Sequence, residues 1–153
     1  WANVEELFLE AFRTVVAAPG PVGDSAHEVL SHEAEYRMRL YLGPNARALR
    51  RLFVEMVCEE HPVIRSAYEH TYLKPIARIR SRLWEFKTAG ALPAGTSVTR
   101  LLDAIEGSVL MRAFCLSPDN IECFLGEIPE YVENLVGDQL HGSGLERTLR
   151  SVS

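Results

Sequence analysis

Residues 62–90 read PVIRSAYEHTYLKPIARIRSRLWEFKTAG, and this stretch decides the fold. Its apolar and aromatic positions recur at spacings of three and four, the pattern of one face of an α-helix. Those positions are Ile64, Tyr68, Tyr72, Pro75, Ile79, Leu83 and Phe86. A narrower second stripe of Leu73, Ala77 and Trp84 lies roughly opposite. Two apolar sides predict a long central helix that is covered by neighbours on both.

The ends and the middle of this helix carry their own signals. Pro62 suits the first helical position, and Gly90 suits the left-handed residue that follows a helix. Pro75 lies inside the run, removes one backbone hydrogen bond and predicts a bend. We expect Tyr68 and Tyr72, just before the bend, to form the wall of a cavity, although core packing is the commoner role for either residue.

The rest of the chain is also helical in pattern. Periodic apolar residues, caps and breakers predict helices over about 3–17, 24–42, 45–60, 98–114 and 117–136, with a kink at Pro129. No segment alternates as a strand does. The fold class is therefore all-α, with about six helices. We expect residues 1–17 to form a linking helix, residues 18–141 the main domain and residues 142–153 a flexible tail.

Composition excludes several classes of protein. The chain has 153 residues, a net charge of −5 and only two lysines, so it is a poor candidate for binding nucleic acid directly. Three cysteines without paired spacing fit a reducing, cytoplasmic setting. No apolar run reaches membrane-spanning length. Because the chain begins at Trp1 without an initiator Met, we expect it to be part of a longer protein.

Motifs for catalysis or metal binding are weak. His27 and His32 differ by five positions, which turns the helix through about 140° and separates the two rings. Cys58 and His61 have a ligand-like spacing but no evident further ligands. The sequence has no glutamate followed by histidine three residues on, no phosphate loop and no serine elbow. We expect no enzyme activity, no metal and no cofactor.

One charged pair interrupts the apolar face of the helix over 24–42. Glu33 and Arg37 are spaced i, i+4 among apolar positions. One interpretation is a surface ion pair at the edge of the stripe, worth a few tenths of a kcal/mol. The other places the two charges at the mouth of a cavity, where they orient a polar group of a ligand.

Aromatic residues and methionines from several helices give the remaining candidate ligand-binding residues. These are Tyr36, Phe53, Met56, Tyr68, Tyr72 and Met111. Such residues form a core more often than a binding pocket. Buried tyrosine hydroxyls nevertheless need partners, and a ligand can supply them.

Two motifs resemble a known family. Trp1-Ala2-Asn3-Val4-Glu5-Glu6-Leu7 looks like the motif that closes the DNA-binding domain of TetR-family regulators, except that Val4 stands where the family usually has a lysine. Residues 85–93, with Gly90 and Leu92, are similar to the pattern that closes the family's long central helix, and a helix with a central glycine, here Gly107, follows. The order of helix lengths agrees along nearly the whole chain. The chain thus resembles the C-terminal, ligand-binding and dimerisation domain of that family.

The resemblance implies a function. A small apolar or aromatic effector would bind between the helices and tilt the first helix, which would change the DNA affinity of a repressor. DNA contact would need a helix-turn-helix domain that this chain lacks. The last two long helices would pair with a second copy in a homodimer. The expected interface residues are Ile105, Ser108, Ile121, Phe124, Leu125, Ile128 and Val132.

A second function remains open. A helical interaction module could dock a partner protein through its apolar faces, without a small-molecule ligand. That alternative predicts no internal cavity and an exposed apolar patch.

Overall fold

A computed structural model describes residues 19–58 and 62–150, with side chains described for 19–55 and 62–142. This described part contains helices and no strand, so the all-α class is confirmed. The elements are α2 (Ala26–Leu42), α3 (Ala46–Cys58), α4 (Pro62–Tyr68), the π-helical turn η1 (Glu69–Leu73), α5 (Lys74–Thr88), α6 (Val98–Cys115), the 3-10 turn η2 (Pro118–Asn120) and α7 (Ile121–Arg150). The expected linking helix over 3–17 lies outside the described residues.

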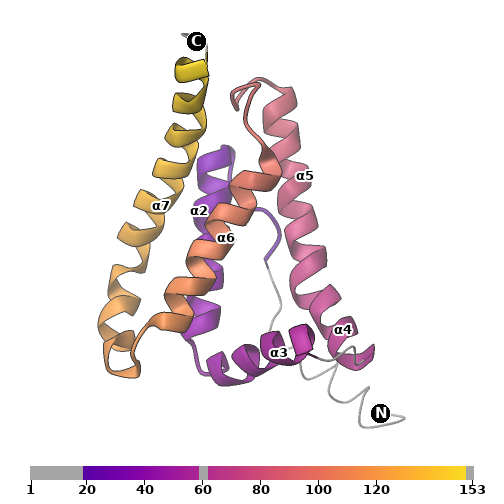
Figure 1. Ribbon diagram of the computed structural model, residues 1–153, viewed down its shortest axis with the longest axis vertical. Coiled ribbons are helices and arrows are strands. Elements are labelled where there is room, and N and C mark those ends of the chain that lie inside the picture. Colours follow the sequence, from indigo (N-terminus) through magenta and orange to yellow (C-terminus); the bar gives the residue numbers. More distant parts are fainter. Residues whose placement is uncertain (1–18, 59–61, 151–153) are drawn as a thin grey trace.

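Helix α2 is the element around which the others pack. It begins after Ser25, whose hydroxyl accepts a hydrogen bond from the Glu28 amide. Its contacts reach α3, α5, α6 and α7, and Figure 1 shows it behind α6, between α7 and α5. The centre of the fold is therefore α2 rather than the 62–90 stretch, because the other helices pack on the buried apolar residues of α2. Those residues include Val29, Leu30, Ala34 and Met38.

The stretch over 62–90 forms α4, η1 and α5 in direct succession. The interruption expected at Pro75 takes the form of a π-helical turn: the Lys74 amide donates to the Glu69 carbonyl, five residues back. Pro75 then falls in the first turn of α5, where its missing N–H costs little. Gly90 follows the helix with φ +79°, as expected of a left-handed terminal residue.

Only one of the two apolar stripes of this stretch is covered. Ile79, Leu83 and Phe86 are buried, whereas Leu73 is 42% exposed and Trp84 is 49% exposed. The expectation of neighbours on both sides is wrong for the described part of the chain. A surface contact reduces the cost of this exposure, because the Lys87 ammonium lies 4.7 Å from the centre of the Trp84 ring.

Helix α7 is longer than its sequence suggests. It was expected to end at Val136 before a flexible tail, but it continues through Gly137 to Arg150, and Pro129 lies inside it. The half-buried Leu140 packs on the core beyond Gly137, and this packing outweighs the low helix propensity of glycine. None of the described helices is long and apolar enough to cross a membrane.

Most of the residues assigned by sequence to a dimer interface belong to the core of this chain. Ile105, Phe124, Ile128 and Val132 are buried within it. Their apolar character is therefore explained without a second copy. Ile121, Leu125 and Ser108 are half-buried, and the Ser108 hydroxyl donates to the Ala104 carbonyl.

Candidate functional site

A charged pair lies in the middle of the helical core. Glu33 and Arg37 sit one turn apart on α2, and Arg37 Nε donates to Glu33 Oε1 across 2.8 Å. Arg37 is 1% exposed and Glu33 is 3% exposed. The interpretation of this pair as a surface ion pair is wrong. Since other helices pack against this side of α2, its polar residues Glu33 and Arg37 are buried along with the apolar residues beside them.

Helix α6 adds a second carboxylate, which sequence reasoning missed. Glu106 is buried, and its Oε1 lies 3.8 Å from Arg37 Nε. The sequence of this helix is largely apolar, and Glu106 shares the spacing of the buried Leu102, Val109 and Ala113. A charged residue in that otherwise apolar row of the sequence was the feature that could have identified Glu106 as a buried carboxylate. The site therefore joins one guanidinium to two carboxylates from two helices.

Burial sets the protonation of these groups. The pKa of Glu106 is raised to about 7: burial is the largest cause, the charge of Arg37 opposes it, and the charge of Glu33 adds a smaller increase. For Arg37, burial lowers the pKa, but Glu106 and Glu33 more than offset this and hold it above its ordinary value. Arg37 thus stays charged, while Glu106 changes charge near neutral pH.

Several polar atoms in this cluster lack partners. Arg37 Nη2, Glu33 Oε2 and the Tyr36 hydroxyl are buried and have no hydrogen-bond partner among the described residues. Leaving such an atom unsatisfied costs on the order of 1–3 kcal/mol. These atoms can therefore bind a polar group placed beside them: Arg37 Nη2 is a hydrogen-bond donor, Glu33 Oε2 is an acceptor, and the Tyr36 hydroxyl can act as either.

Aromatic rings surround the charged cluster. The Arg37 guanidinium lies 4.7 Å from the centre of the Tyr72 ring, and Tyr68 stacks on Tyr72 with centroids 5.1 Å apart. Phe53 of α3 meets both tyrosines edge to face. Tyr41, one turn beyond Arg37 on α2, continues this contact to Phe53. Rings from α2, α3, α4 and η1 therefore form one half-buried aromatic cluster next to the charges.

Tyrosine ionisation is suppressed across the cluster. Burial raises the pKa of Tyr41 to about 12, although the charge of Arg37 lowers it. Burial also raises the pKa of Tyr72, with Glu106 adding to the effect. The tyrosines are therefore neutral at ordinary pH and act as hydrogen-bonding hydroxyls.

The structure brings together most, but not all, of the predicted ligand-binding residues. Glu33, Arg37 and Tyr36 share α2, and Phe53, Tyr68 and Tyr72 form the aromatic cluster. Met111 lies apart: it is 60% exposed and turned about 140° around α6 from Glu106. Met56 belongs to α3, but its side chain lies outside the described set.

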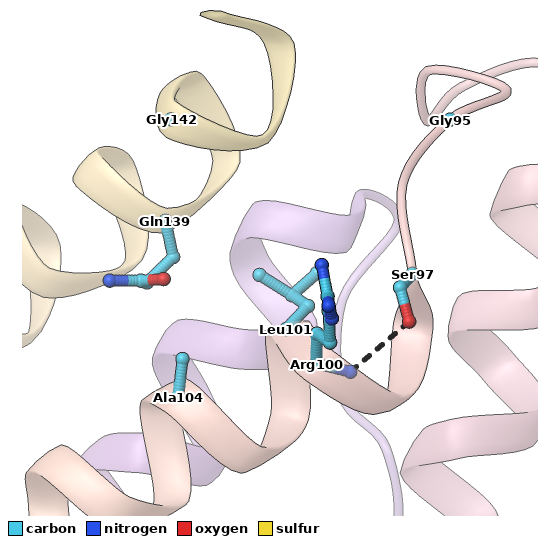
Figure 2. Close-up of a pocket in the computed structure, with 7 residues that line it drawn as sticks. All are labelled: Gly95, Ser97, Arg100, Leu101, Ala104, Gln139 and Gly142. Atoms are coloured by element: carbon cyan, nitrogen blue, oxygen red, sulfur yellow. Dashed lines mark hydrogen bonds between the residues drawn. The ribbon is translucent and has the colours of Figure 1, made fainter. Parts of the chain in front are cut away.

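Surface hollows occur elsewhere on the molecule. One hollow of about 270 Å³ lies between the N-terminal half of α6 and α7, where Figure 2 shows Gln139 facing Leu101 and Ala104. Two shallower hollows follow the outer side of α5 around Ser81 and Glu85. None of these three hollows is lined by the buried charges, so the site is defined by its unpartnered polar atoms.

Metal binding receives no support from the described residues, which contain no group of three or more His, Cys, Asp or Glu side chains that could hold an ion.

Comparison of the chain with protein-family models, curated proteins and solved structures finds no match.

Proposed function

We propose that this chain is the effector-binding and homodimerising domain of a TetR-like transcriptional regulator, in which a small, largely apolar ligand changes DNA affinity. One observation carries the proposal: Arg37 Nη2 and Glu33 Oε2 are buried beside an aromatic cluster and have no hydrogen-bond partner among the described residues. A ligand that meets those atoms recovers the free energy that their burial costs. The half-buried rings of Tyr68 and Tyr72 supply an apolar surface for the rest of the ligand.

The ligand part is tested with a panel of small aromatic compounds and thermal unfolding of the full chain. A compound at a hundredfold excess over its Kd should stabilise the fold by about 2.7 kcal/mol. Tyr72→Ala should reduce this ligand-induced gain because it removes the ring next to Arg37. Trp84→Ala, an exposed aromatic on α5, is the matched control and should leave the gain unchanged. An equal gain in both variants removes Tyr72 from the site.

The homodimer part of the proposal rests on the outer face of α6. Ala104, Gly107, Ser108 and Met111 share this face; Gly107 has open space beside it and Met111 is exposed. Small residues allow a second helix to approach closely, and Met111 supplies apolar area. The hollow that Ala104 lines extends toward the start of α6, where Ser97 and Arg100 also line it (Figure 2).

Sedimentation at micromolar concentration tests the dimer. Wild-type protein should sediment as a dimer, and Met111→Glu should give a folded monomer, because a charge would then be buried at the interface. Leu73→Glu makes the same kind of change on the exposed side of α5 and should leave the dimer intact. A wild-type monomer would contradict this half of the proposal.

One observation favours the alternative function of a protein-interaction module. Leu73 and Trp84 leave apolar surface exposed along α5, as a docking face for another protein would. That function predicts that no compound in the panel stabilises the chain. A saturable stabilisation that is sensitive to Tyr72→Ala would exclude it as the sole function.

A further inference from the structure

The buried ionic cluster has one carboxylate more than its guanidinium can neutralise. Glu33 and Glu106 both approach Arg37, at 2.8 Å and 3.8 Å from its Nε atom. Arg37 and Glu33 are the charged groups that act on Glu106 in the described part of the chain. A second positive charge beside the carboxylates would complete two ion pairs from the four groups.

The unpartnered atoms and the rings fit such a charge. Within the described part of the chain, Glu33 Oε2 is an acceptor without a donor, and the Tyr36 hydroxyl also has no partner and can accept. Tyr72 already holds one cation against its face, the Arg37 guanidinium at 4.7 Å. A planar cation that donates two hydrogen bonds therefore meets the chemistry of the site.

An anionic ligand fits less well. Arg37 Nη2 is a donor without an acceptor, and an anion could approach it. That anion would also lie near Glu33 and Glu106, so it would face two carboxylates against one guanidinium. A single neutral acceptor atom on the ligand satisfies Nη2 without that repulsion.

We propose that this site selects small organic cations, with an amidinium, guanidinium or ammonium group on an aromatic body, over neutral and anionic analogues. The inference rests on the proposed small-molecule site and states which class of ligand the site takes. The cation pairs with Glu33 and Glu106, and its aromatic body lies against the Tyr68 and Tyr72 rings.

Three probes of nearly equal shape test the choice: benzamidine, benzamide and benzoate, each titrated calorimetrically into the full chain at pH 7. Benzamidine should bind at least about tenfold tighter than benzamide, and benzoate more weakly than either. Glu106→Gln keeps the shape of the side chain and should abolish the preference for the cation. Glu130→Gln, an exposed carboxylate on α7, is the control and should preserve it.

Proton release gives a second readout that a merely structural role of Glu106 would not produce. A bound cation favours the ionised carboxylate, so benzamidine binding near pH 7 should release a fraction of a proton. The heat of binding should therefore differ between phosphate and Tris buffers, which differ in ionisation enthalpy. Glu106→Gln should remove that difference.

The possible outcomes distinguish a failure of the cation preference from a failure of the proposed small-molecule site. Equal binding of benzamide and benzamidine, without proton release, overturns the cation preference and leaves the small-molecule site standing. Binding of benzoate alone overturns it in the opposite direction. If none of the three binds, the preference is overturned too, and the proposed effector function fails only if the wider aromatic panel also gives no stabilisation.

Discussion

Helix α2 carries two glutamate–arginine pairs of the same spacing in opposite environments. Glu33 and Arg37 meet at 2.8 Å with side chains that are 3% and 2% exposed. Glu35 and Arg39 meet at 2.7 Å with side chains that are 38% and 48% exposed. Residue types, separation and distance are nearly the same, so packing alone distinguishes the two pairs. It decides whether such a pair is a minor surface contact or a constraint on the whole core.

The difference is energetic as well as geometric. An exposed i, i+4 pair contributes about 0.3–0.5 kcal/mol because water screens it. A buried pair forfeits its hydration, and its attraction need not repay that loss. Glu33–Arg37 is therefore a weak argument for stability, although removing one partner leaves an uncompensated charge. The unpartnered atoms of this buried cluster are the reason why we propose that it binds a ligand.

The largest expected effect comes from deleting the positive charge in each environment. Arg37→Met should lower the free energy of unfolding by about 3–5 kcal/mol, because Glu33 and Glu106 are left buried without a counter-charge. Arg39→Met should lower it by less than about 0.5 kcal/mol. Urea unfolding at pH 7 measures both. Losses of similar size would show that burial does not separate the pairs.

The next effect is the pH dependence that Glu106 confers. Its pKa is raised in the folded chain from an ordinary 4.5 to about 7, so its contribution is fully present below pH 4.5 and is lost as pH rises through about 7. Between these values the folded state holds a proton that the unfolded state has released. The free energy of unfolding should therefore fall by up to about 1.4 kcal/mol per pH unit from this group.

A matched variant isolates that pH dependence. Glu106→Gln cannot titrate, so its stability curve between pH 5 and pH 8 should lack the fall seen for the unsubstituted chain. Glu35→Gln, in the exposed pair, should leave the fall in place. Chemical unfolding at half-unit pH steps gives the comparison, and parallel curves for the unsubstituted chain and Glu106→Gln would refute the assignment.

The sequence predicted the helices well and the environment of the charges poorly. Local signals placed helix starts near residues 24 and 98 and a helix terminus at Gly90, because these features depend on neighbouring residues. The structure has α2 from Ala26, α6 from Val98 and a left-handed Gly90. The burial of residues on α2 depends on helices such as α6 and α7, which pack on it and lie far along the chain. The apolar periodicity places Glu33, and not Glu35, on the apolar face of its helix, but both are glutamates four residues before an arginine. Whether other helices enclose that face at Glu33 cannot be read from the local sequence.

The extent of the long helices was equally non-local. The glycines from Gly137 onward predicted an end of this helix at Val136, yet α7 continues to Arg150 and Leu140 packs on the core. In α5 the pattern predicted two covered sides, and the described chain covers one. Within the candidate site, the sequence predicted the charged residues of α2 and the aromatic residues, but it missed Glu106. The position of Glu106 on the buried side of α6 could be read from its spacing, whereas its partner Arg37 lies on another helix and could not be identified from that spacing.

The smallest effect tests whether the two pairs also differ in their response to salt. The screening length falls from about 10 Å at 0.1 M to about 3 Å at 1 M ionic strength, but ions screen only charges that solvent reaches. A double-mutant cycle of Glu35→Gln and Arg39→Gln should give a coupling of about 0.3–0.5 kcal/mol in low salt that approaches zero at 1 M. The cycle of Glu33→Gln and Arg37→Gln should give a larger coupling that barely changes, because both side chains are buried. If salt weakened the inner coupling as much as the outer one, water and ions would have access to Arg37, and the enclosed site proposed for the cation would be open to solvent.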